Sequence, residues 1–189
     1  VYIANQGDLA GAQALYRQTL ATVPNDYLAL ANLGALIEAR RPGEAQSLYR
    51  KALALRSDYE PALTDLGRLL DRSGHGAEAI GLLQRAVRAD GHSAHAWSAL
   101  GIALARQGRI ADAVTALSRG LALDPGDAET AGNLGLALYK EGNYNGCIGY
   151  LDRGLRAAPG NLDLRATLGL ALARENRLDE AVPLLRQVA

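Results

Sequence analysis

The sequence predicts an all-α protein built from repeated pairs of helices. Five glycines support this prediction, because each follows a leucine and they stand 33, 34, 34 and 34 residues apart: Gly34, Gly67, Gly101, Gly135 and Gly169. Between them, apolar residues recur at intervals of three and four, which is the period of a helix. A repeat of this length is typical of an array in which each unit is one pair of helices. The 189 residues are therefore expected to form a single α-solenoid domain.

The same markers set the expected boundaries of the units. Residues 1–26 should be the tail of one repeat, with a turn at Gly7 and an end at Pro24. Complete repeats are expected at 27–59, 60–93, 94–127 and 128–161, followed by a truncated repeat at 162–189. Prolines agree with these limits, because proline fits the first turn of a helix. Pro61 should begin a first helix, and Asp179 should cap the last helix so that Pro183 falls in its first turn.

The unit at 94–127 shows the pattern most clearly. Its first helix carries apolar and small residues on one face, and its second helix carries them every four residues: Trp97, Leu100, Gly101 and Leu104, then Ala113, Leu117 and Leu121. The pattern resembles the tetratricopeptide repeat, from which it departs at Leu104, Leu117 and Gly120, and the resemblance extends over the whole chain. It implies a right-handed solenoid of less than one superhelical turn, with a concave groove for partner proteins.

Small residues are expected wherever the two helices of a unit cross. The repeat glycines let the backbones approach, and small side chains occupy the matching place on the second helices: Ala12, Ala45, Ala79, Ala113, Cys147 and Ala181. Cys147 is therefore interpreted as a small buried residue and not as a reactive thiol. As the only cysteine, it also excludes an internal disulfide.

Composition argues against several classes of partner. Twenty basic and twenty acidic side chains leave no excess positive charge to hold a phosphate backbone, so nucleic acid is not an expected partner. No apolar run approaches the ~20 residues that span a bilayer, so a soluble protein without membrane insertion is expected. A single cysteine does not distinguish cytoplasm from periplasm, and the localisation stays open.

The sequence offers little sign of catalysis. His92 and His95, with Asp90 nearby, form a conceivable metal half-site, but the loop and helix start that carry them favour ordinary solvated histidines. Gly74-His75-Gly76 resembles part of a dinucleotide-binding motif, yet it follows a helix and not a strand. With no nucleophile motif or phosphate loop, we expect no catalytic residue, no metal, no cofactor and no enzyme activity.

The resemblance places the binding surface on the first helix of each repeat. A clamp for a terminal carboxylate is rejected, because only Asn133 matches among the places it would use: Ser98, Ile102, Asn133, Asp163 and Thr167. An asparagine ladder like that of O-linked N-acetylglucosamine transferases is weakly present, with Asn32 and Asn133 at two of five rungs.

Two further rows follow the repeat glycines. Arg72, Arg106, Lys140 and Arg174 stand five residues after them, either as complements of the helix dipole or as a track for an acidic peptide. Ile102, Leu136 and Leu170 stand one residue after them, either as a contact surface or partly covered by neighbouring helices. The expected peptide-binding set is Asn32, Arg68, Arg72, Ile102, Arg106, Asn133, Leu136, Tyr139, Lys140, Leu170 and Arg174.

The expected function is a non-enzymatic scaffold that holds a peptide or helix of a partner protein in the groove. One alternative is the substrate-recruiting arm of a larger enzyme, such as a glycosyltransferase or sulfotransferase. Another is a bacterial assembly or exopolysaccharide-export scaffold. Apolar residues near the end of the chain, Leu178, Val182 and Leu185, also predict end-to-end self-association.

Overall fold

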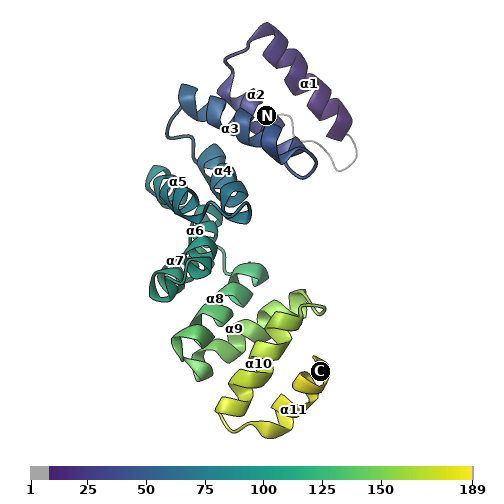
Figure 1. The fold of residues 1–189 in the computed structure, drawn as a ribbon, viewed down its shortest axis with the longest axis vertical. Coiled ribbons are helices and arrows are strands. Elements are labelled where there is room, and N and C mark those ends of the chain that lie inside the picture. Colours follow the sequence, from purple (N-terminus) through teal and green to yellow (C-terminus); the bar gives the residue numbers. More distant parts are fainter. Residues whose placement is uncertain (1–8, 189) are drawn as a thin grey trace. The chain divides into compact units, whose positions relative to one another are not determined.

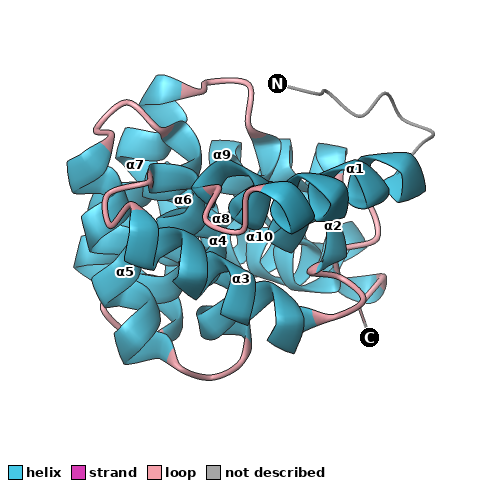
Figure 2. Ribbon diagram, turned by 90° about the horizontal axis from the view of Figure 1, so that it is seen from above, coloured by secondary structure: helices cyan, strands magenta, loops and turns pink. Residues whose placement is uncertain are grey.

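The computed structural model describes residues 9–188 and is helical throughout that range (Figures 1 and 2). No strand occurs there, which confirms the all-α prediction. The described helices are α1 (Leu9–Thr22), α2 (Tyr27–Ile37), α3 (Pro42–Leu55), α4 (Glu60–Arg72), α5 (Gly76–Ala89), α6 (Ala94–Arg106), α7 (Ile110–Leu123), α8 (Ala128–Glu141), α9 (Tyr144–Ala157), α10 (Leu162–Arg174) and α11 (Leu178–Arg186).

The chain divides into two compact units, Val1–Gly91 and His92–Ala189. In the first unit α2 packs on α3 and α4 packs on α5, and in the second α6, α8 and α10 pack on α7, α9 and α11 (Figure 1). Consecutive pairs also touch through their first helices, α2 with α4, α6 with α8, and α8 with α10. We call the surface made by these first helices the first-helix face of each unit.

The repeat glycines allow the two helices of a pair to cross closely. A Cβ at Gly101 would lie 2.5 Å from Cγ of Leu117, and one at Gly135 would lie 2.7 Å from Cγ of Leu151. Any larger residue would therefore force the helices apart. The small residues of the second helices, including Ala113 and Cys147, are fully buried at these crossings, as the spacing predicted.

A left-handed residue ends the first helix of several pairs. Gly74, Gly108 and Gly142 have φ values of 83°, 75° and 91°, a region where glycine carries no Cβ penalty, and Asn176 takes the same role at 59°. The next amide then donates back to a carbonyl of the first helix: His75 to Leu70, Arg109 to Leu104, Asn143 to Leu138 and Arg177 to Leu172. These bonds satisfy helix-end carbonyls and fix where the second helix begins.

Short polar side chains start most of the first helices. The side chains of Asp26, Ser93, Asp127 and Asn161 accept hydrogen bonds from the first free amides of α2, α6, α8 and α10. In α4 the cap residue is Tyr59, and Pro61 lies at the helix start as expected.

The last helix differs from the sequence-based prediction. Its cap is Arg177, because the left-handed turn at Asn176 lets the helix begin two residues earlier than a cap at Asp179 would require. Asp179 lies in the first turn, and Pro183 lies inside α11 and not in its first turn. Leu185 is also less available than expected, since it packs against Gly169 of α10, whereas Leu178 and Val182 are exposed. The expected turn at Gly7 lies outside the described residues.

Candidate functional site

The first-helix face of the second unit carries the apolar row. Ile102 of α6, Leu136 of α8 and Leu170 of α10 each follow a repeat glycine, so they occupy the same place on three adjacent helices. Ile102 and Leu136 are partly buried against the core, together with Tyr139. Leu170 is 45% exposed. The row is thus covered in part by neighbouring helices and open in part to solvent.

Two cavities adjoin this row and meet at α8. The smaller, of about 290 Å³, is lined by residues of α6, α7, α8 and α10 that include Ile102, Arg106 and Lys140. The larger, of about 440 Å³, lies between α8, α9 and α10. Asn133 and Leu136 line both cavities. The face is therefore a hollowed surface whose centre is α8.

Three basic residues of the second unit lie at one edge of this face. Arg106, Lys140 and Arg174 are exposed and stand in the last turns of α6, α8 and α10, where a positive charge complements the helix dipole. Arg174 also lies over the Tyr144 ring, 5.5 Å from its centre, and that ring is 5.3 Å from the ring of Tyr139. Both interpretations of the basic row remain compatible with this arrangement.

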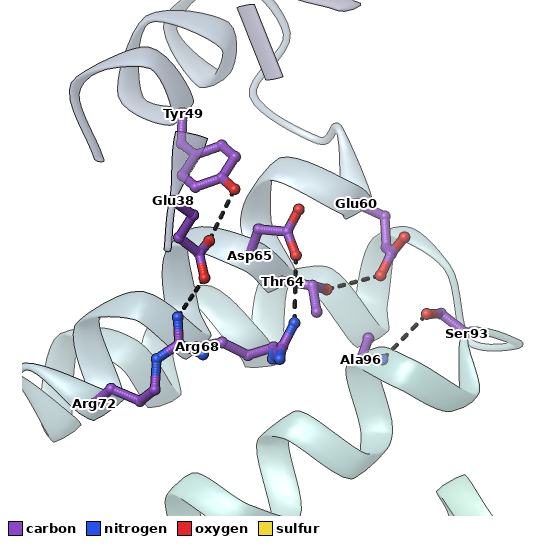
Figure 3. Close-up of polar contacts among 9 residues, drawn as sticks. All are labelled: Glu38, Tyr49, Glu60, Thr64, Asp65, Arg68, Arg72, Ser93 and Ala96. Atoms are coloured by element: carbon purple, nitrogen blue, oxygen red, sulfur yellow. Dashed lines mark hydrogen bonds and ion pairs between the residues drawn. The ribbon is translucent and has the colours of Figure 1, made fainter. Parts of the chain in front are cut away.

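The first-helix face of the first unit is built differently (Figure 3). Arg72 forms an ion pair with Glu38, the C-cap residue of α2, and the same carboxylate accepts a hydrogen bond of 2.9 Å from the buried Tyr49 hydroxyl. Arg68 and Asp65 form a second pair at 3.7 Å. Asn32 is exposed on α2. Here the predicted binding residues Arg68 and Arg72 therefore have acidic partners within their own unit.

Burial and neighbouring carboxylates raise two pKa values in this network. Burial, followed by the nearby charge of Glu38, raises the pKa of Asp65 to about 6, although Arg68 opposes the shift. Burial and the charge of Asp65 likewise raise the pKa of Tyr49. The carboxylates of this network therefore repel one another, and the arginines offset only part of that repulsion.

Consecutive helical pairs of the second unit meet at two junctions. These junctions carry different side chains at the same repeat positions. Between α6, α7 and α8, the buried hydroxyls of Ser98 and Thr130 share a hydrogen bond of 2.8 Å, and Thr130 also bonds to Asp127. Burial acts to raise the pKa of Asp127, but hydrogen bonds from Thr130 and from the Glu129 amide outweigh it and lower that pKa. The Asp127 carboxylate is thereby held ionised beside the start of α8.

The next junction, between α8, α9 and α10, carries no such network at these positions. Thirty-four residues after Ser98 and Thr130 stand Gly132 and Leu164, and Ala157 replaces the Leu123 of the preceding unit. A Cβ on Gly154 would lie only 2.6 Å from Cα of Gly132, so α8 and α9 touch through two glycines. Gly132, Gly154, Ala157 and Leu164 all line the larger cavity.

Other candidate chemistry receives no support. Cys147 is buried, and burial raises the pKa of its thiol to about 11, in agreement with a packing role. Across residues 9–188 there is no group of three or more histidine, cysteine, aspartate or glutamate side chains placed to hold a metal ion. In the same range no helix has the length and apolar character needed to cross a membrane.

Sequence reasoning missed two parts of this site. Glu38, which pairs with Arg72, follows its repeat glycine by four residues, whereas Arg72 follows its own by five. A search for like residues at one repeat position does not reveal an acid at the neighbouring position. The larger cavity could have been found from the loss of side chains at Gly132 and Ala157 relative to Ser98 and Leu123.

Comparisons with solved structures agree on the architecture. PilF of Pseudomonas aeruginosa is 22% identical, with a TM-score of 0.83 over 97% of this chain and 84% of that one. YrrB, described as a TPR protein with an unusual peptide-binding site, is 21% identical, with a TM-score of 0.75 over 92% and 90%. MamA is 25% identical, with a TM-score of 0.72 over 86% and 89%. A search of curated proteins finds no significant match.

Family models give the assignment directly. A tetratricopeptide repeat model matches residues 64–128 and 133–189, which together exceed half of the chain, and a second such model matches residues 104–160. Both the resemblance inferred from the Leu-Gly spacing and the helical solenoid architecture are confirmed. This architecture is typical of protein interaction scaffolds. The chain belongs to the tetratricopeptide repeat family.

Proposed function

We propose that the second unit binds a segment of a partner protein on its first-helix face, without catalysing a reaction on it. The observation that carries the proposal is the apolar row of Ile102, Leu136 and Leu170 beside two cavities. A face that only contacts water is expected to be polar, whereas a binding surface needs apolar area that can be desolvated.

In this proposal the apolar row supplies most of the affinity, and Arg106, Lys140 and Arg174 orient the segment. Exposed charge pairs contribute only about 0–1 kcal/mol each, so the cations guide binding more than they strengthen it. Asn133 and Tyr139 complete the contact from α8, where Asn133 reaches both cavities. Asn32, Arg68 and Arg72 belong to the first unit, and their role in binding stays a prediction.

The test is peptide binding by variants of the full chain. A library of random twelve-residue peptides is displayed and selected on the wild-type protein, and affinities are then measured by fluorescence polarisation. Changing Ile102, Leu136 and Leu170 to serine should weaken the selected peptides more than tenfold with little change in salt dependence. Leu162→Ser is the matched control, because this leucine is also exposed on α10 but lies outside the row.

Melting curves must show that the serine variant stays folded, since Ile102 and Leu136 are partly buried. A second variant with only Leu170→Ser avoids this problem, because that side chain is already exposed. Unchanged affinity in both variants would remove the first-helix face as the binding surface.

End-to-end self-association is a separate part of the proposal. Leu178 and Val182 are 53% and 42% exposed on α11, which is enough apolar surface to favour contact with another copy. Light scattering over a range of concentrations should show mass rising with concentration, and Val182→Asp should reduce the rise. A constant monomer mass in the wild type would reject self-association.

A further inference from the structure

The larger cavity of the second unit, which we call the junction cavity, is lined in part by residues smaller than their counterparts in the preceding unit. Gly132 and Gly154 bring the backbones of α8 and α9 together, and Ala157 stands where the preceding unit has Leu123. Its volume of about 440 Å³ is within the usual range for ligand pockets, roughly 300–1,000 Å³. Because Leu136 is part of both, the cavity continues directly from the apolar row.

The interior of the junction cavity suits an apolar stem. Its walls include Leu136 and Leu164 together with the two glycines and Ala157. A long side chain of methylene groups can pack against such walls while its polar head reaches the rim.

The polar groups of the cavity favour a positive head group. Among the described lining residues, Glu129 is the one charged side chain, and Asn133 and Asn161 add amide groups. The ion pairs found within residues 9–188 do not include Glu129, and its side chain is exposed. Its carboxylate is therefore available to a cation brought by a partner.

One of the helix ends around the cavity also favours a cation. The lining residues Ala157 and Ala158 form the carboxyl end of α9, which carries partial negative charge. The amino ends of α8 and α10 would favour an anion, but Asp127 already accepts from the amides of Glu129 and Thr130, and Asn161 accepts from the amide of Leu164. The nearby Arg153 and Arg165 donate to the carbonyls of Pro125 and Pro159 and do not line the cavity.

We propose that the junction cavity takes one arginine or lysine side chain of the bound partner segment. The stem lies against Leu136 and Leu164, and the cationic head meets Glu129 and the end of α9. This inference rests on the proposed function, because it concerns a segment already held on the first-helix face. It also predicts the orientation of the bound segment. The basic row lies at the carboxyl ends of α8 and α10, whereas the junction cavity lies near their amino ends.

The experiment uses the full chain and the displayed twelve-residue peptides whose binding Leu170→Ser weakens. In each peptide, every arginine or lysine is replaced in turn by citrulline, which keeps the shape of arginine without its charge, by leucine and by glutamate. Affinities are measured for the wild type, Glu129→Gln and Ala157→Leu. Ala122→Leu is the matched control, because Ala122 is likewise exposed near the end of its helix but lies outside the cavity.

One cation in each peptide should be critical. Replacing it by citrulline should weaken binding to the wild type and to Ala122→Leu about fivefold, as expected for a partly desolvated charge pair. This fivefold difference should disappear in Glu129→Gln, which lacks the carboxylate, and in Ala157→Leu, which fills the cavity.

Two results would overturn the inference while leaving the proposed function intact: peptides that lose nothing when their cations become citrulline, or a cation effect that persists undiminished in both cavity variants. A preference for leucine over arginine at the critical position would likewise show that the cavity is an apolar pocket. Recovery of no peptide that depends on the first-helix face would reject both the inference and the proposed function.

Discussion

The two units carry first-helix faces of opposite character on the same helical scaffold. In the first unit, Glu38 and Asp65 pair with Arg72 and Arg68, so the charges of α2 and α4 meet each other. In the second unit, the equivalent surface of α6, α8 and α10 exposes an apolar row and opens into two cavities. Residues at like positions of a regular repeat, such as Arg72 and Lys140, can therefore have different neighbours.

The largest expected effect comes from breaking the charged face of the first unit. Glu38→Ala removes the acceptor of the buried Tyr49 hydroxyl and the partner of Arg72. The free energy of unfolding should fall by about 1–3 kcal/mol, the cost of an unsatisfied buried polar group, with relief of Asp65 offsetting a small part. Urea denaturation monitored by circular dichroism measures the change.

Glu38→Gln is the control for that experiment, because the amide oxygen can still accept from Tyr49. It should lose only about 1 kcal/mol, because it removes the charge of a half-buried ion pair and keeps the hydrogen bond. Equal losses in the two variants would mean that the charge and not the Tyr49 hydrogen bond stabilises this face.

A smaller effect should follow from relieving the repulsion at Asp65. Its folded-state pKa of about 6 lies above the ordinary 3.8, so the folded protein binds this proton more tightly than the unfolded chain. Asp65 should therefore add stability as the pH falls from 7 to 4, against the loss expected from Asp127, whose pKa is lowered, and Asp65→Asn should remove this contribution. At pH 8 the variant should be about 1–2 kcal/mol more stable, allowing for the lost pair with Arg68.

Urea midpoints across pH 4–8 test the Asp65 prediction. Asp71→Asn is a suitable comparison, as a neighbouring aspartate of α4 that is partly exposed. A wild type whose stability falls steadily below pH 6, with Asp65→Asn following the same curve, would contradict the shifted pKa.

The smallest expected effect separates the basic residues of the two units. Lys140→Glu should weaken binding of an acidic displayed peptide about two- to fivefold, and the loss should shrink as salt rises. Arg72→Glu should change the same affinity less than twofold, because Arg72 is paired with Glu38. Comparable losses in the two variants would bring the first unit into the binding surface.

The sequence predicted those features that depend on spacing and on backbone chemistry. The 34-residue period located the helical pairs, and the repeat glycines marked the crossings. The start of the last helix was predicted two residues too late, because Asn176 takes the left-handed conformation that glycine takes in the earlier turns. As a result Asp179 was wrongly assigned as the cap of α11.

The candidate site was less predictable because it depends on contacts between different repeat positions. The pairing of Arg72 with Glu38 and the cavity beside Gly132 both require knowing how three or more helices meet. The single-domain boundaries, the peptide-binding residues and the absence of nucleic acid partners stay predictions. Binding experiments test the last two.

The reaction rate of the buried Cys147 thiol measures how often the second unit opens locally. A thiol with a pKa of about 11 and no exposed surface reacts with an alkylating reagent only while α8 and α9 are transiently separated. Because it is the only cysteine, the labelling rate in native buffer reports that one separation without added probes. A bound partner that bridges α8 and α10 would slow the reaction in proportion to the fraction of protein it occupies.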